Sequence, residues 1–172
     1  MPLVTRVSGK TVGIVGMGRV GAAVAKRLAA FDCEIAYFDV CRRADLPYAF
    51  VADLVELARR AEFLIVTLAG GEATKGIVAA GVLEALGPDG ILINVSRGST
   101  VDERALLSAL EERAIKAAGL DVFWNEPNID ERLKVLDNAI LQPHHASVRR
   151  RRGGPWESWC GTILPRISRA RH

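Results

Sequence analysis

The strongest constraint on this chain is a cluster of glycines where a strand-like pattern changes to a helix-like pattern. The segment KTVGIVGMGRVGAAVAKRL, residues 10–28, contains four glycines within nine positions. Glycine inside an element costs roughly 0.5–1 kcal/mol relative to alanine, so this spacing indicates a backbone that something approaches too closely for a Cβ atom. Gly16, Gly18 and Gly21 fit G-x-G-x-x-G, in which the glycines permit a tight turn, close approach of a pyrophosphate and close helix–strand packing. We therefore expect a dinucleotide to bind there, since the positive end of a helix dipole favours phosphates.

The rest of the chain alternates short apolar strands with helical stretches. Strands are expected at 11–16, 33–39, 63–68, 90–96, 116–122 and 138–142, and helices at 18–31, 53–61, 79–87 and 102–113. Continuous apolar strands that alternate with helices are typical of parallel pairing with both faces of the sheet covered. The sequence therefore predicts the α/β class, with a Rossmann-type doubly wound parallel sheet. Thr100 and Glu103 have the spacing of a capping box, which predicts a helix N-terminus there.

An acidic residue ends the second predicted strand. Asp39 comes 18 residues after Gly21, where a carboxylate would accept hydrogen bonds from the adenosine ribose. Such an acid would repel a 2′-phosphate, so NAD is favoured over NADP as the cofactor. Arg42 and Arg43 leave NADP open, because an arginine just after this strand can hold that phosphate, although both fit a solvated loop equally well. Met17 is interpreted as an apolar filler in the turn.

Composition restricts the class of protein. The 172 residues are 49% hydrophobic and 25% charged, which is typical of one soluble globular domain. No apolar run reaches the length of a membrane span, and the first residues lack the apolar core of a secretory signal. The three cysteines are odd in number and lack metal-ligand spacing, so we expect a reducing, cytoplasmic setting and no metal site.

Charge is unevenly distributed along the chain. Residues 149–172 hold seven arginines and one glutamate, so the net charge of +3 arises from this tail and the preceding 148 residues carry −3. The body therefore gives no electrostatic reason to expect nucleic acid as a partner, and we expect neither nucleic acid nor membrane. A genuine basic tail for such a surface remains an alternative, although four consecutive arginines specify no binding mode.

Four motifs occur along the chain in the order GKTVGIVGMGRVG, LINVSRGSTVDERAL, GLDVFWNEP and LQPHHAS. Together they resemble the cofactor domain of the D-isomer-specific 2-hydroxyacid dehydrogenase family, in particular its glyoxylate/hydroxypyruvate reductase-like branch. The resemblance implies NAD(P)-dependent interconversion of 2-keto acids and D-2-hydroxy acids by hydride transfer. It also implies that residues 1–147 form an NAD(P)-binding domain, which in this family commonly forms a homodimer.

Reduction of a keto acid needs groups that bind the carboxylate, polarise the carbonyl and deliver a proton. Arginine binds oxyanions through its planar fork, and histidine titrates near neutral pH, which suits proton transfer. The resemblance assigns these roles to Arg97 and His144, with Glu126 orienting the histidine. His145 is a rival for His144 on chemistry alone, and Arg97 and Glu126 also fit ordinary solvated positions after a strand and in a loop.

The resemblance also assigns contacts with the cofactor. It implies that Asp121 lies near the nicotinamide carboxamide, although this residue could simply end a strand. It sets Val95 and the backbone of Gly18, Arg19 and Val20 against the dinucleotide.

Most of the substrate domain of this family precedes the cofactor domain, so the resemblance implies that it is largely absent from this truncated chain. A keto acid would then lie on an open face without exclusion of water, which puts turnover in doubt. Two other hypotheses therefore stay open: a truncated, non-catalytic dinucleotide-binding module, and an NADH-sensing scaffold that binds partners. Binding of NADH without turnover of glyoxylate would favour the module.

The tail at 148–172 departs from the family, which continues with an amphipathic helix. It has no helical period and contains two of the three tryptophans. Codons permitted for residues 154–169 include a set that, read from the third base, encodes AMGELVRDNLAAHFA, with apolar residues at helical spacing. We interpret the segment as an aberrant tail produced by a frameshift and expect residues 149–172 to be poorly packed.

Overall fold

The structure, a computed structural model that describes residues 5–144, is built on one parallel sheet. Its strands are β1 (Thr11–Val15), β2 (Glu34–Phe38), β3 (Ala49–Phe50), β4 (Phe63–Val66), β5 (Ile91–Asn94), β6 (Ala117–Leu120) and β7 (Ala139–Leu141). The helices are α1 (Arg19–Ala29), α2 (Leu54–Arg60), α3 (Ala80–Leu86), α4 (Glu103–Glu111) and α5 (Glu131–Val135), with short 3₁₀ turns η1 (Glu72–Thr74) and η2 (Gly98–Thr100). The predicted aberrant tail, 148–172, lies outside the described residues.

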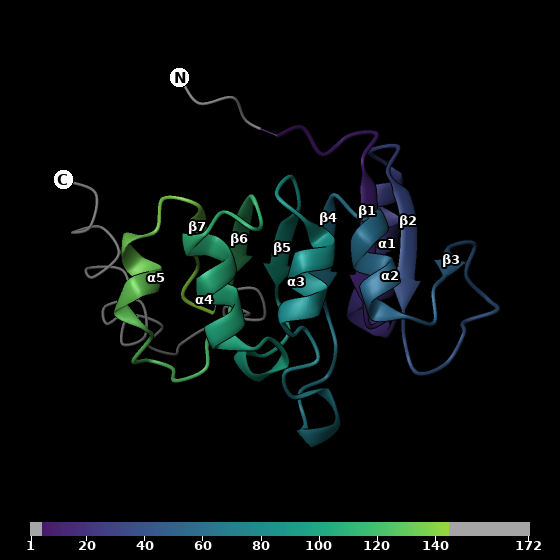
Figure 1. Cartoon of the computed structure of the whole chain (residues 1–172). Helices are drawn as coiled ribbons and strands as arrows, with labels where there is room; N and C mark the ends of the chain where they lie inside the picture. The colour runs from purple at the N-terminus through teal and green to yellow at the C-terminus, as the bar shows by residue number, and fades with distance from the viewer. Residues whose placement is uncertain (1–4, 145–172) are drawn as a thin grey trace, which may run out of the picture.

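The order of the strands determines where a ligand can lie. Neighbouring strands follow the order β3-β2-β1-β4-β5-β6-β7, and Figure 1 shows this row running from β3 on the right to β7 on the left. The chain winds outward from β1 to β3 and then crosses back to β4, so the direction of winding reverses between β1 and β4. Ligands of open α/β sheets bind at the carboxyl ends of the strands beside such a reversal. The predicted Rossmann-type doubly wound sheet is confirmed.

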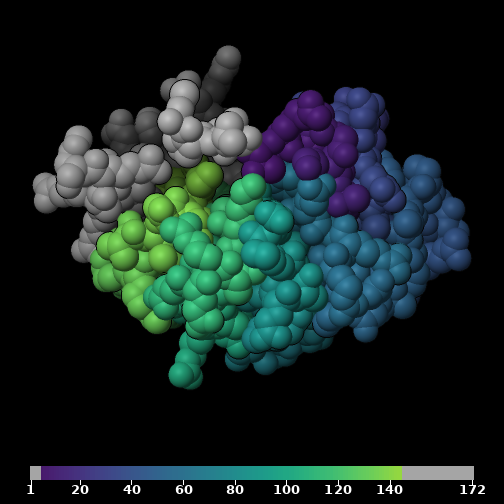
Figure 2. Space-filling view, turned by 45° about the horizontal axis from the view of Figure 1, so that its top comes forward, coloured from purple at the N-terminus to yellow at the C-terminus, as the bar shows by residue number. Residues whose placement is uncertain are grey.

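One face of the sheet is covered by α2, α3 and α4, and α5 adds Leu133 to the same core. The core on this face joins Leu57 of α2, Leu83 of α3 and Leu107 of α4 to Leu64 and Leu92 of the sheet, and all five side chains are buried. These helices lie side by side in Figure 1, and in Figure 2 their surface runs from blue through teal to green. Burial of this apolar area is the main force that holds the row of helices on the strands.

The opposite face is covered by α1. Its cluster joins Ala25 of α1 to Val12, Ile14 and Tyr37 of the sheet, with the fully buried side chain of Met17 among them. Among the described helices, α1 alone contributes to this cluster. The glycine turn that leads into α1 is therefore anchored in the core on one side and lies at the carboxyl edge of the sheet on the other.

Some local elements differ from the sequence predictions. The strand β3 and the helix α5 were not expected, because two and five residues are too short to show a period. The predicted capping box is wrong, since α4 is capped by Asp102, whose carboxylate accepts a hydrogen bond from the Ala105 N–H. Thr100 is instead buried in η2 and donates its hydroxyl to the Arg97 carbonyl over 2.7 Å. No helix within 5–144 is long and apolar enough to cross a bilayer.

Candidate functional site

Most of the predicted site residues lie at one edge of the sheet because they follow a strand. Gly16 follows β1, Asp39 follows β2, residues 95–97 follow β5, Asp121 follows β6, and His144 comes shortly after β7. All the pairings between these strands are parallel, so their carboxyl ends meet at this edge. The edge therefore brings residues far apart in sequence to the place where a doubly wound sheet binds its ligand.

The turn between β1 and α1 holds glycine at three positions for different reasons. Gly16 has a φ of +97°, a conformation that side chains rarely adopt. A Cβ atom on Gly21 would lie 2.1 Å from the Gly16 carbonyl oxygen, so glycine is needed for α1 to approach the turn this closely. A Cβ atom on Gly18 would meet no atom within 4 Å. The bare backbone at Gly18 therefore serves no packing among the described residues and leaves space for a ligand.

The helix α1 begins directly at this turn. Gly18 is its N-cap, which provides no side-chain cap, and the first turn contains no acidic residue. Arg19 and Val20 are exposed there. The first N–H groups of a helix lack partners within the helix, and a phosphate satisfies them while matching the dipole. The turn thus fits the paired phosphates of a dinucleotide.

Hydrogen bonds tie the glycine turn to the strands on both sides. The Met17 N–H donates to Asp39 Oδ2 over 2.7 Å, and the Val40 N–H donates to Asp39 Oδ1 over 2.7 Å. On the other side, the Thr67 hydroxyl after β4 donates to the Gly16 carbonyl over 2.6 Å. Met17 is therefore more than the apolar filler that the sequence suggested, because its backbone orients the carboxylate predicted to bind the ribose. Thr67 belongs to no motif and was not predicted.

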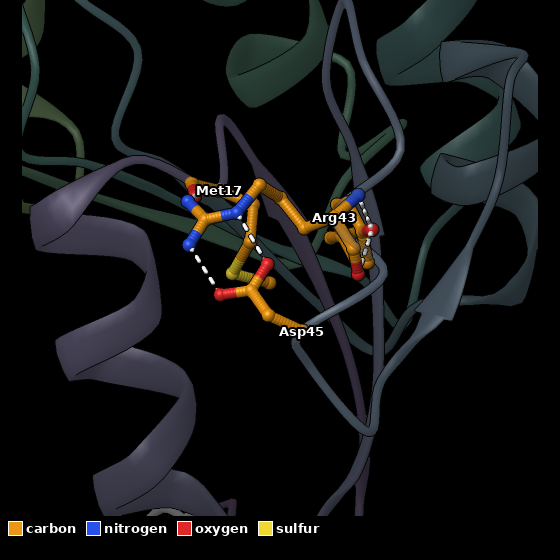
Figure 3. A network of polar contacts seen from close by, with 4 residues as sticks. Met17, Arg43 and Asp45 are labelled. Atoms are coloured by element: carbon orange, nitrogen blue, oxygen red, sulfur yellow. Dashed lines mark hydrogen bonds and ion pairs between the residues drawn. The ribbon is translucent and has the colours of Figure 1, made fainter.

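Arg43 reaches back to the same turn from the loop after β2, as Figure 3 shows. Its Nη1 atom donates to the Met17 carbonyl over 3.1 Å, while Nε and Nη2 donate to the two carboxylate oxygens of Asp45 over 2.8 and 2.7 Å. The Arg43 N–H donates to the Tyr37 hydroxyl over 2.7 Å. The hydrogen bond from Arg43 holds the pKa of the Asp45 carboxyl below its usual value, and the same bond raises the pKa of Arg43. Arg42 is exposed.

Glu126 and His144 form a hydrogen-bonded pair at the same edge. His144 Nδ1 lies 2.8 Å from Glu126 Oε2, and the Phe123 N–H donates to Glu126 Oε1 over 2.8 Å. An ionised carboxylate only accepts, so the proton of this bond is assigned to Nδ1 and the Nε2 atom is left for other chemistry. The side chains of His144 and Glu126 are 30% and 20% exposed, so the pair is shielded but accessible.

The loop that carries Arg97 packs by its backbone against the loop that carries Glu126. A Cβ atom on Gly98 would lie 2.1 Å from the Phe123 carbonyl carbon, so the bare glycine lets the loop after β5 contact the loop that carries Glu126. Arg97 itself is exposed, and its Nη1 atom donates to the carbonyl of the preceding residue over 2.7 Å. Within the described residues no side-chain hydrogen bond joins Arg97 to Glu126 or His144, which leaves most of its guanidinium donors available.

Val95 and Asp121 are held at the edge by the sheet itself. The Val95 N–H donates to the Val66 carbonyl over 3.2 Å, and the Asp121 N–H donates to the Asn94 carbonyl over 3.0 Å. Asp121 is 8% exposed. Among residues 5–144, no group of three or more histidine, cysteine or acidic side chains is placed to hold a metal ion.

Most of the chain is similar to known dehydrogenases. Residues 2–146 match the family described as D-isomer specific 2-hydroxyacid dehydrogenase, NAD binding domain. A 2-ketogluconate reductase of Gluconobacter oxydans is 47% identical over 147 residues, which are 86% of this chain and 47% of that protein. A glyoxylate/hydroxypyruvate reductase A of Arabidopsis thaliana is 44% identical over 145 residues, which are 84% of this chain and 46% of that protein.

A solved structure shows the same fold. The NADPH-dependent glyoxylate/hydroxypyruvate reductase from Sinorhizobium meliloti, in complex with NADP and malonate, gives a TM-score of 0.82 at 44% identity, covering 96% of this chain and 50% of that chain. The chain spans about half the length of the curated relatives it matches. From the glycine turn, the strand order and the match over residues 2–146, we conclude that the chain belongs to the D-isomer specific 2-hydroxyacid dehydrogenase family, as its NAD binding domain.

Proposed function

We propose that the chain binds NAD(H) along the carboxyl edge of the sheet and serves the reduction of 2-keto acids to D-2-hydroxy acids. The observation that carries this proposal is the hydrogen-bonded pair of Glu126 and His144, 2.8 Å apart, at the edge that also holds the glycine turn. The relatives that are named as glyoxylate/hydroxypyruvate and 2-ketogluconate reductases support small keto acids as the class of substrate.

The proposed reaction divides its tasks among three side chains. A bound nicotinamide supplies the hydride that reduces the carbonyl carbon. His144 delivers the proton from Nε2 to the carbonyl oxygen, which becomes the hydroxyl of the product. Glu126 holds the imidazole through Nδ1 and balances the positive charge that the ring carries before the transfer. Arg97 binds the substrate carboxylate through its guanidinium fork, which matches the geometry of an oxyanion.

The remaining features of the proposal concern the cofactor and the setting. NADH is the preferred cofactor, because the carboxylate of Asp39 is fixed beside the glycine turn, where it accepts ribose hydroxyls and repels a 2′-phosphate. Among residues 5–144 the two cysteines, Cys33 and Cys41, have free thiols. The reducing cytoplasm is the proposed location. We also propose a homodimer formed through this domain.

A second candidate function is a dinucleotide-binding module without catalysis, which includes an NADH-sensing scaffold. It is favoured by the exposure of Arg97, whose guanidinium has no side-chain partner among the described residues. In this case the glycine turn would bind the cofactor, and no keto acid would be turned over.

The experiment compares binding and turnover on the full chain. NADH is titrated by fluorescence, and the loss of NADH is followed in the presence of glyoxylate or hydroxypyruvate. We expect the His144→Ala variant to bind NADH as the wild type does and to lose turnover by a factor of roughly 100 or more, as expected for removal of a general acid. The matched control is His145→Ala, the neighbouring histidine, which should retain turnover.

Each other outcome has a distinct meaning. Binding of NADH without turnover by the wild-type chain favours the non-catalytic module. Loss of turnover in His145→Ala but not in His144→Ala would exchange the two assignments. Absence of NADH binding by the wild-type chain would contradict both functions.

A further inference from the structure

The guanidinium fork of Arg43 is occupied by a carboxylate from its own chain. Nε and Nη2, one of the two pairs of donors through which a guanidinium binds oxyanions, donate to the two oxygens of Asp45 over 2.8 and 2.7 Å. Figure 3 shows the Asp45 carboxylate facing one edge of the guanidinium, with two dashed lines between them. The side chains of Arg43 and Asp45 are 41% and 63% exposed, so a ligand from solvent can reach both.

This ion pair lies beside the position expected for the adenosine ribose. Met17 is the link, because its N–H donates to Asp39 and its carbonyl accepts from Arg43 Nη1 over 3.1 Å. One residue of the glycine turn therefore connects the carboxylate proposed to bind the ribose hydroxyls with the guanidinium that could bind a 2′-phosphate. The hydrogen bond from the Arg43 N–H to the buried Tyr37 hydroxyl further fixes the loop.

A phosphate and a carboxylate bind to an arginine fork in the same bidentate geometry, so they compete for the same two donors. We propose that Asp45 is a specificity-determining residue, which occupies the fork of Arg43 and thereby favours NADH over NADPH. The proposal rests on the proposed binding of the dinucleotide at the glycine turn. Asp45 acts here through Arg43 and is a positioning residue.

An alternative reading treats the Arg43–Asp45 pair as an ordinary surface ion pair, which contributes little to stability or function. A second alternative assigns the 2′-phosphate to Arg42, which is exposed and forms no hydrogen bond or ion pair within the described part of the chain. The ratio of NADPH to NADH affinity separates these cases, because a purely structural role of Asp45 would change both affinities together.

The test measures dissociation constants for NADH and NADPH by fluorescence titration of the full chain. In Asp45→Asn the affinity for NADPH should rise about tenfold relative to that for NADH, the effect expected when a charge-assisted hydrogen bond becomes available to the phosphate. The gain should vanish in Asp45→Asn combined with Arg43→Ala, and Asp45→Glu should keep the wild-type ratio. The gain should persist when Asp45→Asn is combined with Arg42→Ala.

The matched control is Asp137→Asn, which removes an equal charge from another surface pair, Arg113–Asp137 at 2.6 Å. Its ratio should equal that of the wild type. An unchanged ratio in Asp45→Asn, or an equal gain in Asp137→Asn, overturns the inference while leaving the proposed function intact. A gain that requires Arg42 rather than Arg43 also overturns it. If the wild-type chain binds neither dinucleotide, the proposed function fails, and the inference fails with it.

Discussion

The backbone N–H of Met17 donates to the Oδ2 atom of Asp39 over 2.7 Å, which joins the glycine turn to the end of β2. The bond fixes the carboxylate relative to the N-terminus of α1, so the proposed sites for the phosphates and for the ribose keep a constant separation. It also satisfies a backbone donor next to a fully buried side chain.

Removing this carboxylate should affect both folding and cofactor binding. In Asp39→Ala the N–H groups of Met17 and Val40 lose their acceptor. We expect the free energy of unfolding to fall by about 1 kcal/mol in urea titrations, since the site is partly solvated. The affinity for NADH should fall about tenfold, because the ribose loses its acceptor. A stability loss with unchanged NADH affinity would contradict the proposed ribose contact.

Alanine substitutions at two glycines of the turn should affect different properties, NADH affinity at Gly18 and stability at Gly21. A Cβ atom at Gly18 meets no atom within 4 Å, so Gly18→Ala should change the free energy of unfolding by less than about 1 kcal/mol. Its affinity for NADH should nevertheless fall at least about tenfold, because the methyl group would occupy the space of the phosphates. Gly21→Ala places a Cβ atom 2.1 Å from a carbonyl oxygen and should destabilise the chain by about 3 kcal/mol. A stable Gly18→Ala with wild-type affinity would show that the space at Gly18 serves no ligand.

The contact between the Arg97 and Glu126 loops should depend on Gly98. In Gly98→Ala the new methyl group would lie 2.1 Å from the Phe123 carbonyl carbon, so we expect a loss of about 2–3 kcal/mol in the free energy of unfolding. Gly81 of α3 is a matched control, because a Cβ atom there meets nothing within 4 Å, and Gly81→Ala should stabilise the helix by about 0.5–1 kcal/mol. Equal stability of the two variants in chemical denaturation would refute the close contact.

The glutamate should act on turnover rather than on cofactor binding. Glu126→Gln retains an acceptor for the Phe123 N–H but presents a neutral amide to His144. We expect turnover to fall by roughly 100-fold or more, because the charged form of the imidazole loses its partner, with the NADH dissociation constant unchanged. Glu112→Gln, at an exposed acid bonded to Ser108, is the control and should match the wild type. Wild-type turnover in Glu126→Gln would show that the pair of Glu126 and His144 takes no part in the reaction.

The proposed frameshift is tested at the level of the gene. We expect sequencing around codon 148 to reveal a one-base change of frame, and the corrected frame to encode apolar residues at helical spacing. A gene that encodes residues 148–172 without such a change would contradict the proposal and favour a genuine basic tail.

The parts of the fold and site that sequence could predict are those with a repeating or motif-based signal. The apolar strands from β1 to β7, apart from β3, gave the doubly wound sheet, and the spacing of Gly16, Gly18 and Gly21 gave the turn. The resemblance to a family also singled out Glu126 and His144, which the structure joins by a hydrogen bond.

Other features depend on contacts that no local pattern encodes. Two hydrogen bonds hold the glycine turn: the Thr67 hydroxyl donates to the Gly16 carbonyl, and the Met17 N–H donates to Asp39. Neither threonine nor methionine is a distinctive residue type at its position. The capping-box spacing suggested Thr100 as the N-cap of α4. The helix begins two residues later, and its N-cap is Asp102. The hydrogen bonds from the Arg43 guanidinium to Asp45 likewise depend on the folded conformation of the loop after β2.

A crystal structure of the full chain grown with NADH puts the bare glycine turn to the sharpest test. We predict density for the pyrophosphate against Gly18 and the first N–H groups of α1, with the ribose hydroxyls within hydrogen-bond distance of Asp39. A structure in which the dinucleotide lies elsewhere, while the space beside Gly18 stays empty or is filled by a side chain, would contradict the proposed cofactor site.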